Sequence, residues 1–303
     1  MPKPYYNLLQ SNLGSIVFDP KRHLQSLERA KNTAGTGDDF LLERIVEDML
    51  ERLSAINRTF ENGIALFGRT PLLRDAMNAS PQINNTLRVE ETVHAGDADH
   101  IVSGENFDLK PNSVDLVLAP FGLHWANDLP GALIQLHQAI KPDGLLMAVL
   151  PGPDTLNELR DSLLTAESET SGGAAMRVDP FTDIRDAGGL LQRAGYALPV
   201  VDRDDVVVRY NTPLDLVRDL RKMGANGQLK TALPSLNRRT IAQLLSTYQE
   251  RYADNDGRLR ATFSLISLSG WVPHESQQKP LKPGSAKSRI ADALNVDEVK
   301  LKP

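Results

Sequence analysis

Residues 113–150 read SVDLVLAPFGLHWANDLPGALIQLHQAIKPDGLLMAVL, and this stretch decides the fold. Its two apolar runs, Ser113–Ala119 and Leu145–Leu150, have the length and the continuous hydrophobicity of buried parallel strands. Between them, Pro130–Ile140 has the spacing of a helix, and KPDG at Lys141–Gly144 predicts a turn. Strand, helix, turn and strand make a right-handed crossover unit, so the segment predicts an α/β domain with a parallel sheet.

The flanking segments extend this alternation in both directions. Towards the N-terminus, the sequence predicts two helices, a strand, a further helix and a weaker strand, at Asp19–Lys31, Asp38–Arg58, Gly63–Phe67, from Pro71, and Leu87–Val93. Towards the C-terminus, it predicts helices at Asp154–Glu167 and Thr182–Arg193, a strand at Val206–Tyr210, helices at Pro213–Met223 and Arg238–Tyr252, and a last strand at Thr262–Trp271.

Two consecutive helices without a strand between them break the alternation, so Asn211–Ala261 is interpreted as a helical insertion between neighbouring final strands. The predicted organisation lists five regions: N-terminal helices (1–58), an α/β core (59–210), the helical insertion (211–261), the last strand with its following loop (262–284) and a C-terminal tail (285–303).

Composition excludes several classes of function. The 34 basic and 39 acidic residues give a net charge of −5, which provides no broad positive field for nucleic acid. The absence of cysteine excludes disulfides, thiolate metal sites and a cysteine nucleophile, and the six histidines show no metal-ligand spacing, so no metal site is expected. No apolar run approaches the roughly 20 residues that span a bilayer, and the first residues lack a signal-peptide core. These observations predict a cytoplasmic protein without a transmembrane segment.

The loop FGLHWAND, residues 121–128, is the most unusual candidate site. It follows a predicted buried strand, and ligands of open α/β sheets bind beyond the carboxyl ends of the strands. One interpretation places His124 and Trp125 in the wall of a cleft, with Asn127 or Asp128 capping the next helix. In the alternative, the aromatic side chains only seal the strand to its helices.

Two further segments offer acid or base groups. Asp154 lies in PGPDT, just after the strand that ends at Leu150, although capping of the next helix by Asp154 or Thr155 is the more expected role, since both are ordinary N-cap residues. His274 and Glu275 follow the last predicted strand, where a solvated loop is the alternative. The candidate catalytic residues are therefore His124, Asp154, His274 and Glu275.

Three strings in the same order resemble one methyltransferase-like family: SVDLVLAPFGLHWANDLPGAL at 113–133, KPDGLLMAVLPGPDTLNELR at 141–160 and GWVPHESQQKPLKPGSA at 270–286. This family includes a mitochondrial complex I assembly factor described as an arginine hydroxylase and, more distantly, the malonyl-carrier methyltransferases of biotin synthesis. The likeness runs from about Phe18 to Gly284. It implies a Rossmann-like, seven-stranded methyltransferase sheet, S-adenosylmethionine as the cofactor, and a helical insertion that acts as a lid.

The sequence departs from this family where the cofactor is expected to bind. Family members carry an acid and glycines in the manner of D-L-G-C-G-x-G after the first strand, since the backbone must approach the methionine moiety closely. Here the matching residues, Ala65 to Pro71, read ALFGRTP. Gly68 falls at a position that the family does not give to glycine, and Phe67 or Arg69 would put a side chain into the cofactor's space.

The resemblance implies further cofactor contacts around the same cleft. The ribose acid corresponds to Glu90 or Glu91, and the adenine acid to Asp97 or Asp99. The implied cofactor-binding residues are Ala65, Phe67, Gly68, Glu90, Asp97, Asp99, Leu123 and Trp125.

Two functions from different classes stay open. The first is an S-adenosylmethionine-dependent methyltransferase with an atypical cofactor loop, acting on a small-molecule or protein substrate by positioning it. The second is a non-methylating family member that binds a respiratory complex I subunit and assists its assembly. Hydroxylation of arginine is a third expectation, from the resemblance, although the sequence shows no iron triad.

Overall fold

The computed structural model describes residues 16–33, 39–91, 96–102, 105–231 and 233–278. The chain divides into two units, Met1–Pro273 and His274–Pro303, and the fold below is that of the first unit. The predicted tail, 285–303, lies outside the described residues.

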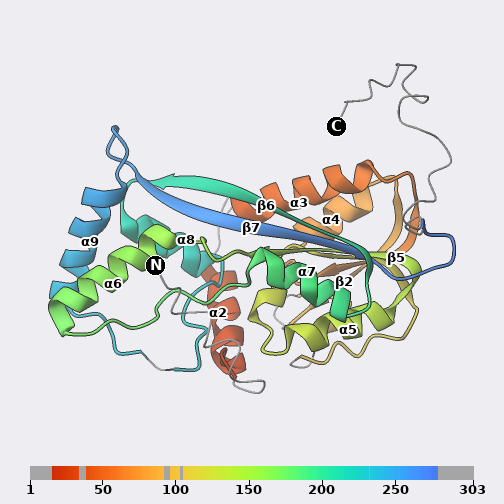
Figure 1. Cartoon of the computed structure of the whole chain (residues 1–303), viewed down its shortest axis with the longest axis horizontal. Coiled ribbons are helices and arrows are strands. Elements are labelled where there is room, and N and C mark those ends of the chain that lie inside the picture. The colour runs from red at the N-terminus through yellow and green to blue at the C-terminus, as the bar shows by residue number, and fades with distance from the viewer. Residues whose placement is uncertain (1–15, 34–38, 92–95, 103–104, 232, 279–303) are drawn as a thin grey trace, which may run out of the picture. The chain divides into compact units, whose positions relative to one another are not determined.

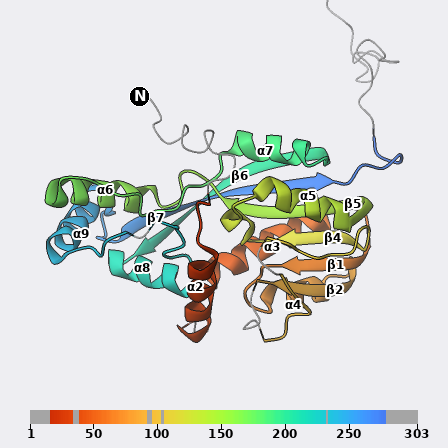
Figure 2. The same cartoon turned by 90° about the horizontal axis from the view of Figure 1, so that it is seen from below.

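A seven-stranded sheet forms the centre of this unit, in the order β3-β2-β1-β4-β5-β7-β6 (Figures 1 and 2). The strands are β1 Phe60–Leu66, β2 Ile83–Glu90, β3 His100–Ile101, β4 Val114–Ala119, β5 Ile140–Pro151, β6 Ala197–Tyr210 and β7 Leu259–Trp271. The first five strands pair in parallel, whereas β7 runs antiparallel to both β5 and β6. The predicted seven-stranded α/β sheet is confirmed.

Helices cover both faces of the sheet. Their bounds are α2 Pro20–Thr33, α3 Phe40–Ser54, α4 Leu72–Ala79, α5 Leu129–Ala139, α6 Asn157–Ser171, α7 Ile184–Arg193, α8 Pro213–Lys222 and α9 Arg238–Tyr252. Side chains alternate between the two faces along a strand, so in β4 Leu116 packs into the core that contains α3 and α4, while Val117 packs into the core with α5 and α7. Two-sided burial explains the continuously apolar runs in the sequence.

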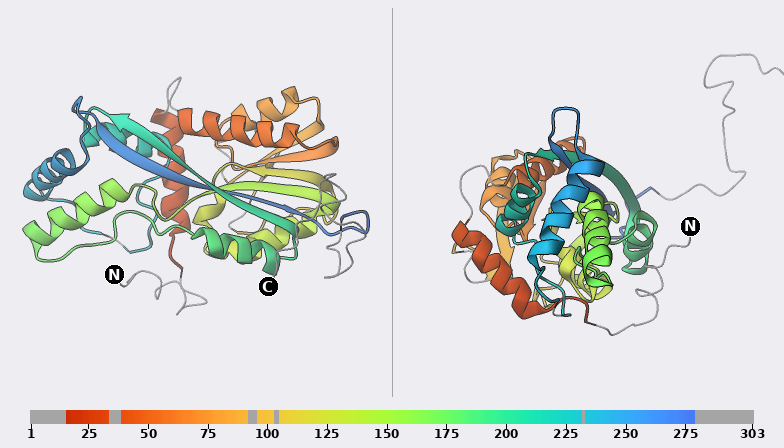
Figure 3. Two further views of the ribbon diagram at one scale, coloured as in Figure 1. Left: turned by 45° about the horizontal axis from the view of Figure 1, so that its top comes forward. Right: turned by 90° about the vertical axis from the view of Figure 1, so that its left-hand side faces the viewer.

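Helices α6, α8 and α9 form a separate group, which we call the lid. Helices α8 and α9 lie in the chain between β6 and β7, and α9 packs beside α6 at one end of these two long strands (Figures 1 and 3). Local signals start both helices: Thr212 and Asp215 form a reciprocal capping box on α8, and the Asn237 side chain accepts a hydrogen bond from the Thr240 amide of α9. The boundaries of the five regions expected from the sequence remain predictions.

Two local expectations differ from the structure, and one strand was not predicted. The KPDG segment is not a turn outside the strand but the irregular start of β5, with Asp143 at φ 66° and a register shift against β4. Neither Asp154 nor Thr155 caps a helix, because α6 begins after Leu156, whose own φ is 55° and which provides no side-chain cap. The two-residue strand β3 has too little sequence to carry a periodic signal. In contrast, Asp128 caps α5 by accepting a hydrogen bond from the Gly131 amide at 2.9 Å.

Candidate functional site

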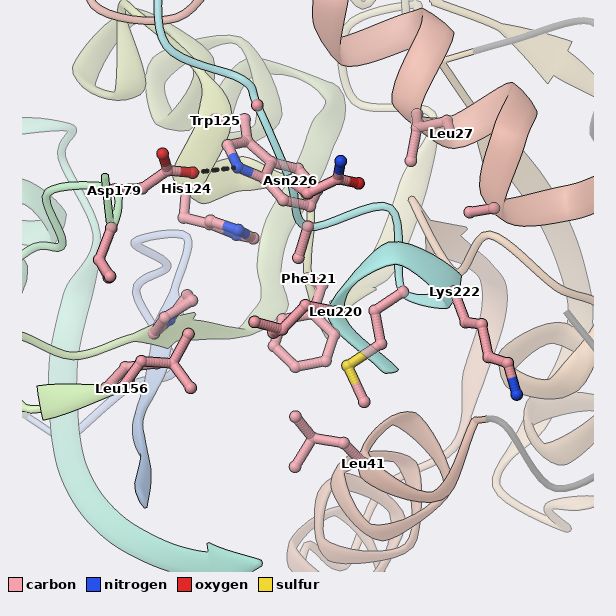
Figure 4. Close-up of a pocket in the computed structure, with 18 of the residues that line it drawn as sticks. Leu27, Leu41, Phe121, His124, Trp125, Leu156, Asp179, Leu220, Lys222 and Asn226 are labelled. Atoms are coloured by element: carbon pink, nitrogen blue, oxygen red, sulfur yellow. Dashed lines mark hydrogen bonds between the residues drawn. The ribbon is translucent and has the colours of Figure 1, made fainter. Parts of the chain in front are cut away.

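A cavity of about 580 Å³ lies where the carboxyl ends of β1, β2, β4 and β5 meet helices α2, α3 and the lid. Pockets for small ligands commonly measure about 300–1,000 Å³, so its size fits a ligand or an inserted side chain. Charged and aromatic residues that follow the strand ends line one part of it, and leucines of the lid line another. Figure 4 shows His124 and Trp125 beside Asp179, with Leu220 of α8 among the apolar residues.

The loop after β1 has the backbone of a glycine loop without the glycines. Phe67 has φ 54° and Arg69 has φ 58°, which is the left-handed region that favours glycine. A non-glycine residue in this region costs about 1–3 kcal/mol. These are two of the three positions at which the family's D-L-G-C-G-x-G string has glycine, so the backbone keeps a glycine-like conformation there although the residues have changed; the third position is Pro71, with φ −63°.

The Phe67 side chain fills space beside the loop after β4. It is only 5% exposed and stacks on Phe107 with ring centroids 5.8 Å apart. A Cβ atom added to Gly122 would lie 2.5 Å from the Phe67 Cβ, and real Cβ atoms do not approach so closely. Only glycine at position 122 therefore admits Phe67 here.

The Arg69 side chain lines the cavity and reaches two other elements. Its Nη2 lies 2.8 Å from Asp39 Oδ1 just before α3, and its Nη1 donates to the Lys222 carbonyl at the end of α8, at 3.3 Å. Burial lowers the pKa of Arg69, opposed by the charges of Asp39 and Glu90, but an arginine remains charged at any physiological pH. Arg69 thus ties the core to the lid across the cavity wall.

Glu90, at the end of β2, is bonded on both oxygens by the protein itself. Arg88 Nε donates to its Oε1 at 2.9 Å, and the Arg69 backbone N–H donates to its Oε2 at 3.3 Å. Burial raises the pKa of Glu90 to about 7, although Arg88 acts in the opposite direction. The Arg88 guanidinium also pairs with Asp97, and the Arg88 amide donates to Asp99 Oδ2 at 2.8 Å.

These residues do not fit S-adenosylmethionine bound in the family's manner. Phe67 and Arg69 place side chains where the cofactor needs bare backbone, and Glu90 has donors on both oxygens instead of ribose hydroxyls. The acids implied for adenine, Asp97 and Asp99, are engaged by Arg88. We therefore derive no chemical step through this cofactor.

An aromatic and acidic group forms another part of the cavity wall. Trp125 Nε1 donates to Asp179 Oδ2 at 3.4 Å, and the His124 ring lies 4.0 Å from the Trp125 ring, centroid to centroid (Figure 4). Burial raises the pKa of Asp179 to about 6, against the opposing effects of the Trp125 hydrogen bond and of His23. Burial lowers the pKa of His124 to about 3, so this imidazole is neutral at physiological pH, and its buried Nδ1 has no hydrogen-bond partner among the described residues.

His23 of α2 connects this group to the end of β2. Its Nε2 lies 2.7 Å from Glu91 Oε2, and its ring packs against Trp125 with centroids 4.5 Å apart. Burial lowers the pKa of His23, but hydrogen bonding to Glu91 and the charge of Glu91 outweigh it, so the net shift is upward.

The residues proposed from the sequence fall into three groups. Lining the cavity are Phe67, Glu90, His124 and Trp125. Near it, but among other partners, are Ala65 and Leu123 in the hydrophobic cores, Gly68 against the Leu73 side chain, and Asp97 and Asp99 beside Arg88. The third group is Asp154, which is half-exposed and pairs with Arg203 at 2.8 Å, with His274 and Glu275, which are exposed in the second unit.

Asp179, His23 and Arg88 were not among the residues proposed from the sequence. Asp179 lies outside regular secondary structure, 54 residues along the chain from Trp125. A buried arginine inside a strand is unusual, and Arg88 two residues before an acid is the one signal that sequence inspection could have used. Among the described residues, no group of three or more histidine, aspartate or glutamate side chains is arranged to hold a metal.

The strand order, with an antiparallel β7 and a cavity at the carboxyl ends of the parallel strands, defines a methyltransferase-type domain. The methyltransferase domain family matches residues 80–148. A solved structure of a Bacillus halodurans protein, provisionally described as a methyltransferase, superposes with a TM-score of 0.50 over 75% of this chain and 98% of its own, at 11% identity. That likeness concerns the fold.

Sequence relatives identify the family more narrowly. The mitochondrial arginine hydroxylase NDUFAF5 of Danio rerio is 34% identical over 97% of this chain and 84% of its own, and that of Homo sapiens is 33% identical over 85% and 77%. A malonyl-[acyl-carrier protein] O-methyltransferase of Methylovorus is 34% identical over 86% of this chain and 91% of its own. The chain belongs to the methyltransferase-fold family of the NDUFAF5 arginine hydroxylases.

The prediction of a cytoplasmic protein is wrong, since the relatives from zebrafish, Dictyostelium discoideum and human are named as mitochondrial. The reasons behind it, no cysteine and no signal-peptide core, do not distinguish one reducing compartment from another. No helix in the described part of the chain is long and apolar enough to cross a membrane.

Proposed function

We propose that this protein is a non-methylating member of its family, which binds an arginine side chain of a respiratory complex I subunit and acts in the assembly or modification of that subunit. The observation behind this proposal is the position of Asp179 in the cavity wall beside Trp125 and His124. The relatives named arginine hydroxylases act on the same type of side chain, and the misfit of the S-adenosylmethionine site argues against methyl transfer.

A guanidinium group matches this part of the cavity in charge and in shape. One oxygen of Asp179 accepts the Trp125 indole hydrogen bond, and within the described part of the chain no other hydrogen bond reaches this carboxylate, so its second oxygen can accept one from a ligand. Arginine stacks on aromatic faces and forms short, charge-assisted hydrogen bonds with carboxylates. An uncompensated buried carboxylate is costly, and the raised pKa of Asp179 expresses that cost. An arriving cation would remove it.

His124 contributes by being neutral. An imidazolium beside the bound guanidinium would repel it, whereas a neutral ring with a low pKa does not. The ring can also accept a hydrogen bond from a guanidinium N–H. The leucines of the lid exclude water around the bound side chain and strengthen its pairing with Asp179. These residues bind and orient the arginine, and we assign them no redox step.

The test is binding of peptides from the complex I subunits, each compared with its arginine-to-alanine form, followed by tryptophan fluorescence or by calorimetry. Asp179→Asn is expected to weaken binding at least about tenfold, because a charge-assisted hydrogen bond contributes about 1.5–3 kcal/mol. Asp154→Asn is the matched control, since Asp154 does not line the cavity and pairs with Arg203. Equal affinity of the arginine and alanine peptides would rule the proposal out.

A further inference from the structure

Beside the proposed arginine site, the loop after β1 and the end of β2 carry large side chains that the proposed function does not require. We infer that the Phe67 and Arg69 side chains fill the place of the S-adenosyl cofactor and that Arg88 supplies a hydrogen-bond donor to Glu90, so that the site is occupied by the protein's own groups. It follows that the site would again admit an S-adenosyl ligand if the loop side chains were removed.

The Phe67 and Arg69 side chains occupy space that the cofactor would need. The Phe67 ring is almost completely buried, and Gly122 admits it only by having no side chain. Arg69 follows two residues later, and both residues keep the positive φ of a glycine loop. A loop that is strained by large residues, yet follows the path glycines would take, indicates that the side chains and not the backbone close the site.

Hydrogen-bond donors of the chain also replace those that a ribose would offer to Glu90. A buried carboxylate needs hydrogen-bond donors wherever they come from. At Glu90 both donors belong to the chain, namely Arg88 Nε and the Arg69 amide. Arg88 Nη2 also donates to the Arg69 carbonyl at 2.9 Å, so the same guanidinium holds the acid and the loop together. In a cofactor-binding relative, ribose hydroxyls would have to satisfy an acid at this position.

Arg69 also connects the elements that surround the site. A bound ligand links the elements that surround it, and Arg69 does so here without a ligand, through Asp39 before α3 and the Lys222 carbonyl of α8. The guanidinium groups of Arg69 and Arg88 thus connect the loop after β1 with β2, α3 and the lid.

The experiment is calorimetry with S-adenosylhomocysteine on the full chain. The wild type is expected to show no binding at millimolar ligand, whereas Phe67→Gly/Arg69→Gly is expected to bind at least tenfold more tightly than the limit that the wild-type titration sets. Glycine adopts positive φ readily, so the double variant keeps the loop path. Asn112→Gly is the matched control, because Asn112 also has positive φ, at 49°, and does not line the cavity; it should behave as the wild type.

Micromolar binding by the wild type would overturn the inference, as would a folded double variant that remains silent. If the double variant does not fold, the single variants Phe67→Gly and Arg69→Gly decide: binding by either supports the inference, and silence of both as folded proteins contradicts it. If neither single variant folds, the wild-type titration decides by itself. The arginine-peptide assay reads a different part of the cavity, so its failure and the failure of this inference can be told apart.

Discussion

Arg88 and Glu90 stand two residues apart on β2, on the same face of the sheet, and the Arg88 Nε donates to Glu90 Oε1 at 2.9 Å with both side chains buried. Residues i and i+2 of a strand share a face, so the pair is built into the local sequence R-V-E. Burial of a lone charge is very costly, and removal of one partner leaves the other uncompensated. The pair is therefore a fixed structural element of the cofactor region.

Arg88→Met is expected to destabilise the protein by about 3–5 kcal/mol, because it leaves Glu90 buried without its Nε donor and the Arg69 carbonyl without Arg88 Nη2. Urea denaturation followed by circular dichroism measures the change. The control is Arg44→Met, which removes an exposed arginine paired with Asp204 and should leave stability almost unchanged. Equal effects of the two substitutions would contradict the role assigned to Arg88.

Gly122→Ala is expected to cost about 2–4 kcal/mol in the wild type, since the new Cβ would overlap Phe67 and the residue has φ 92°. In a Phe67→Gly background the overlap disappears, and only the backbone strain remains. A double-mutant cycle by denaturation should therefore give a coupling of about 1 kcal/mol or more. Additive costs would show that Phe67 does not depend on Gly122.

The centre of the fold could be predicted because β4 and the second part of β5 are buried on both faces. The runs in β4 and β5 are continuously apolar for this reason, and the prolines and caps around α8 and α9 mark the helices of the lid. The strand β3 and the irregular start of β5 depend on pairing with neighbours, which a local window does not contain. Asp154 or Thr155 was expected to cap α6, but Asp154 pairs with Arg203 on β6 and Thr155 donates to the Ser264 carbonyl on β7.

The candidate site could be predicted only in part. The loop after β4 and the changed glycine loop are visible in the sequence, because Trp125 is one of two tryptophans and Phe67 replaces a glycine of the family string. Asp179 reaches Trp125 from a segment without periodicity, and His23 comes from an N-terminal helix. These contacts between residues far apart in the sequence depend on tertiary packing, so no spacing rule along the chain predicts them.

Asn237→Ala is expected to destabilise the lid by about 1 kcal/mol, because the Asn237 side chain caps α9 through the Thr240 amide at 2.9 Å. Hydrogen exchange of α9 amides should rise, while exchange in β1 and β4 stays the same. Ser246→Ala, at an exposed position of the same helix, serves as the control. Uniform exchange changes throughout the sheet would mean that α9 does not open separately.

Affinity for an arginine peptide is expected to rise with pH through about 6 and to level off near pH 7, because burial raises the pKa of Asp179 to about 6 and only the ionised carboxylate pairs with a guanidinium. Below pH 6, the dissociation constant should increase as the pH falls, approaching a tenfold increase per pH unit, since a proton competes with the cation for the carboxylate. Asp179→Asn removes the titrating group and should flatten this profile. His23 also titrates nearby and pairs with Glu91, so His23→Gln is the second control and should preserve the rise. A profile that persists unchanged in Asp179→Asn would assign the pH dependence, and with it the arginine contact, to another group.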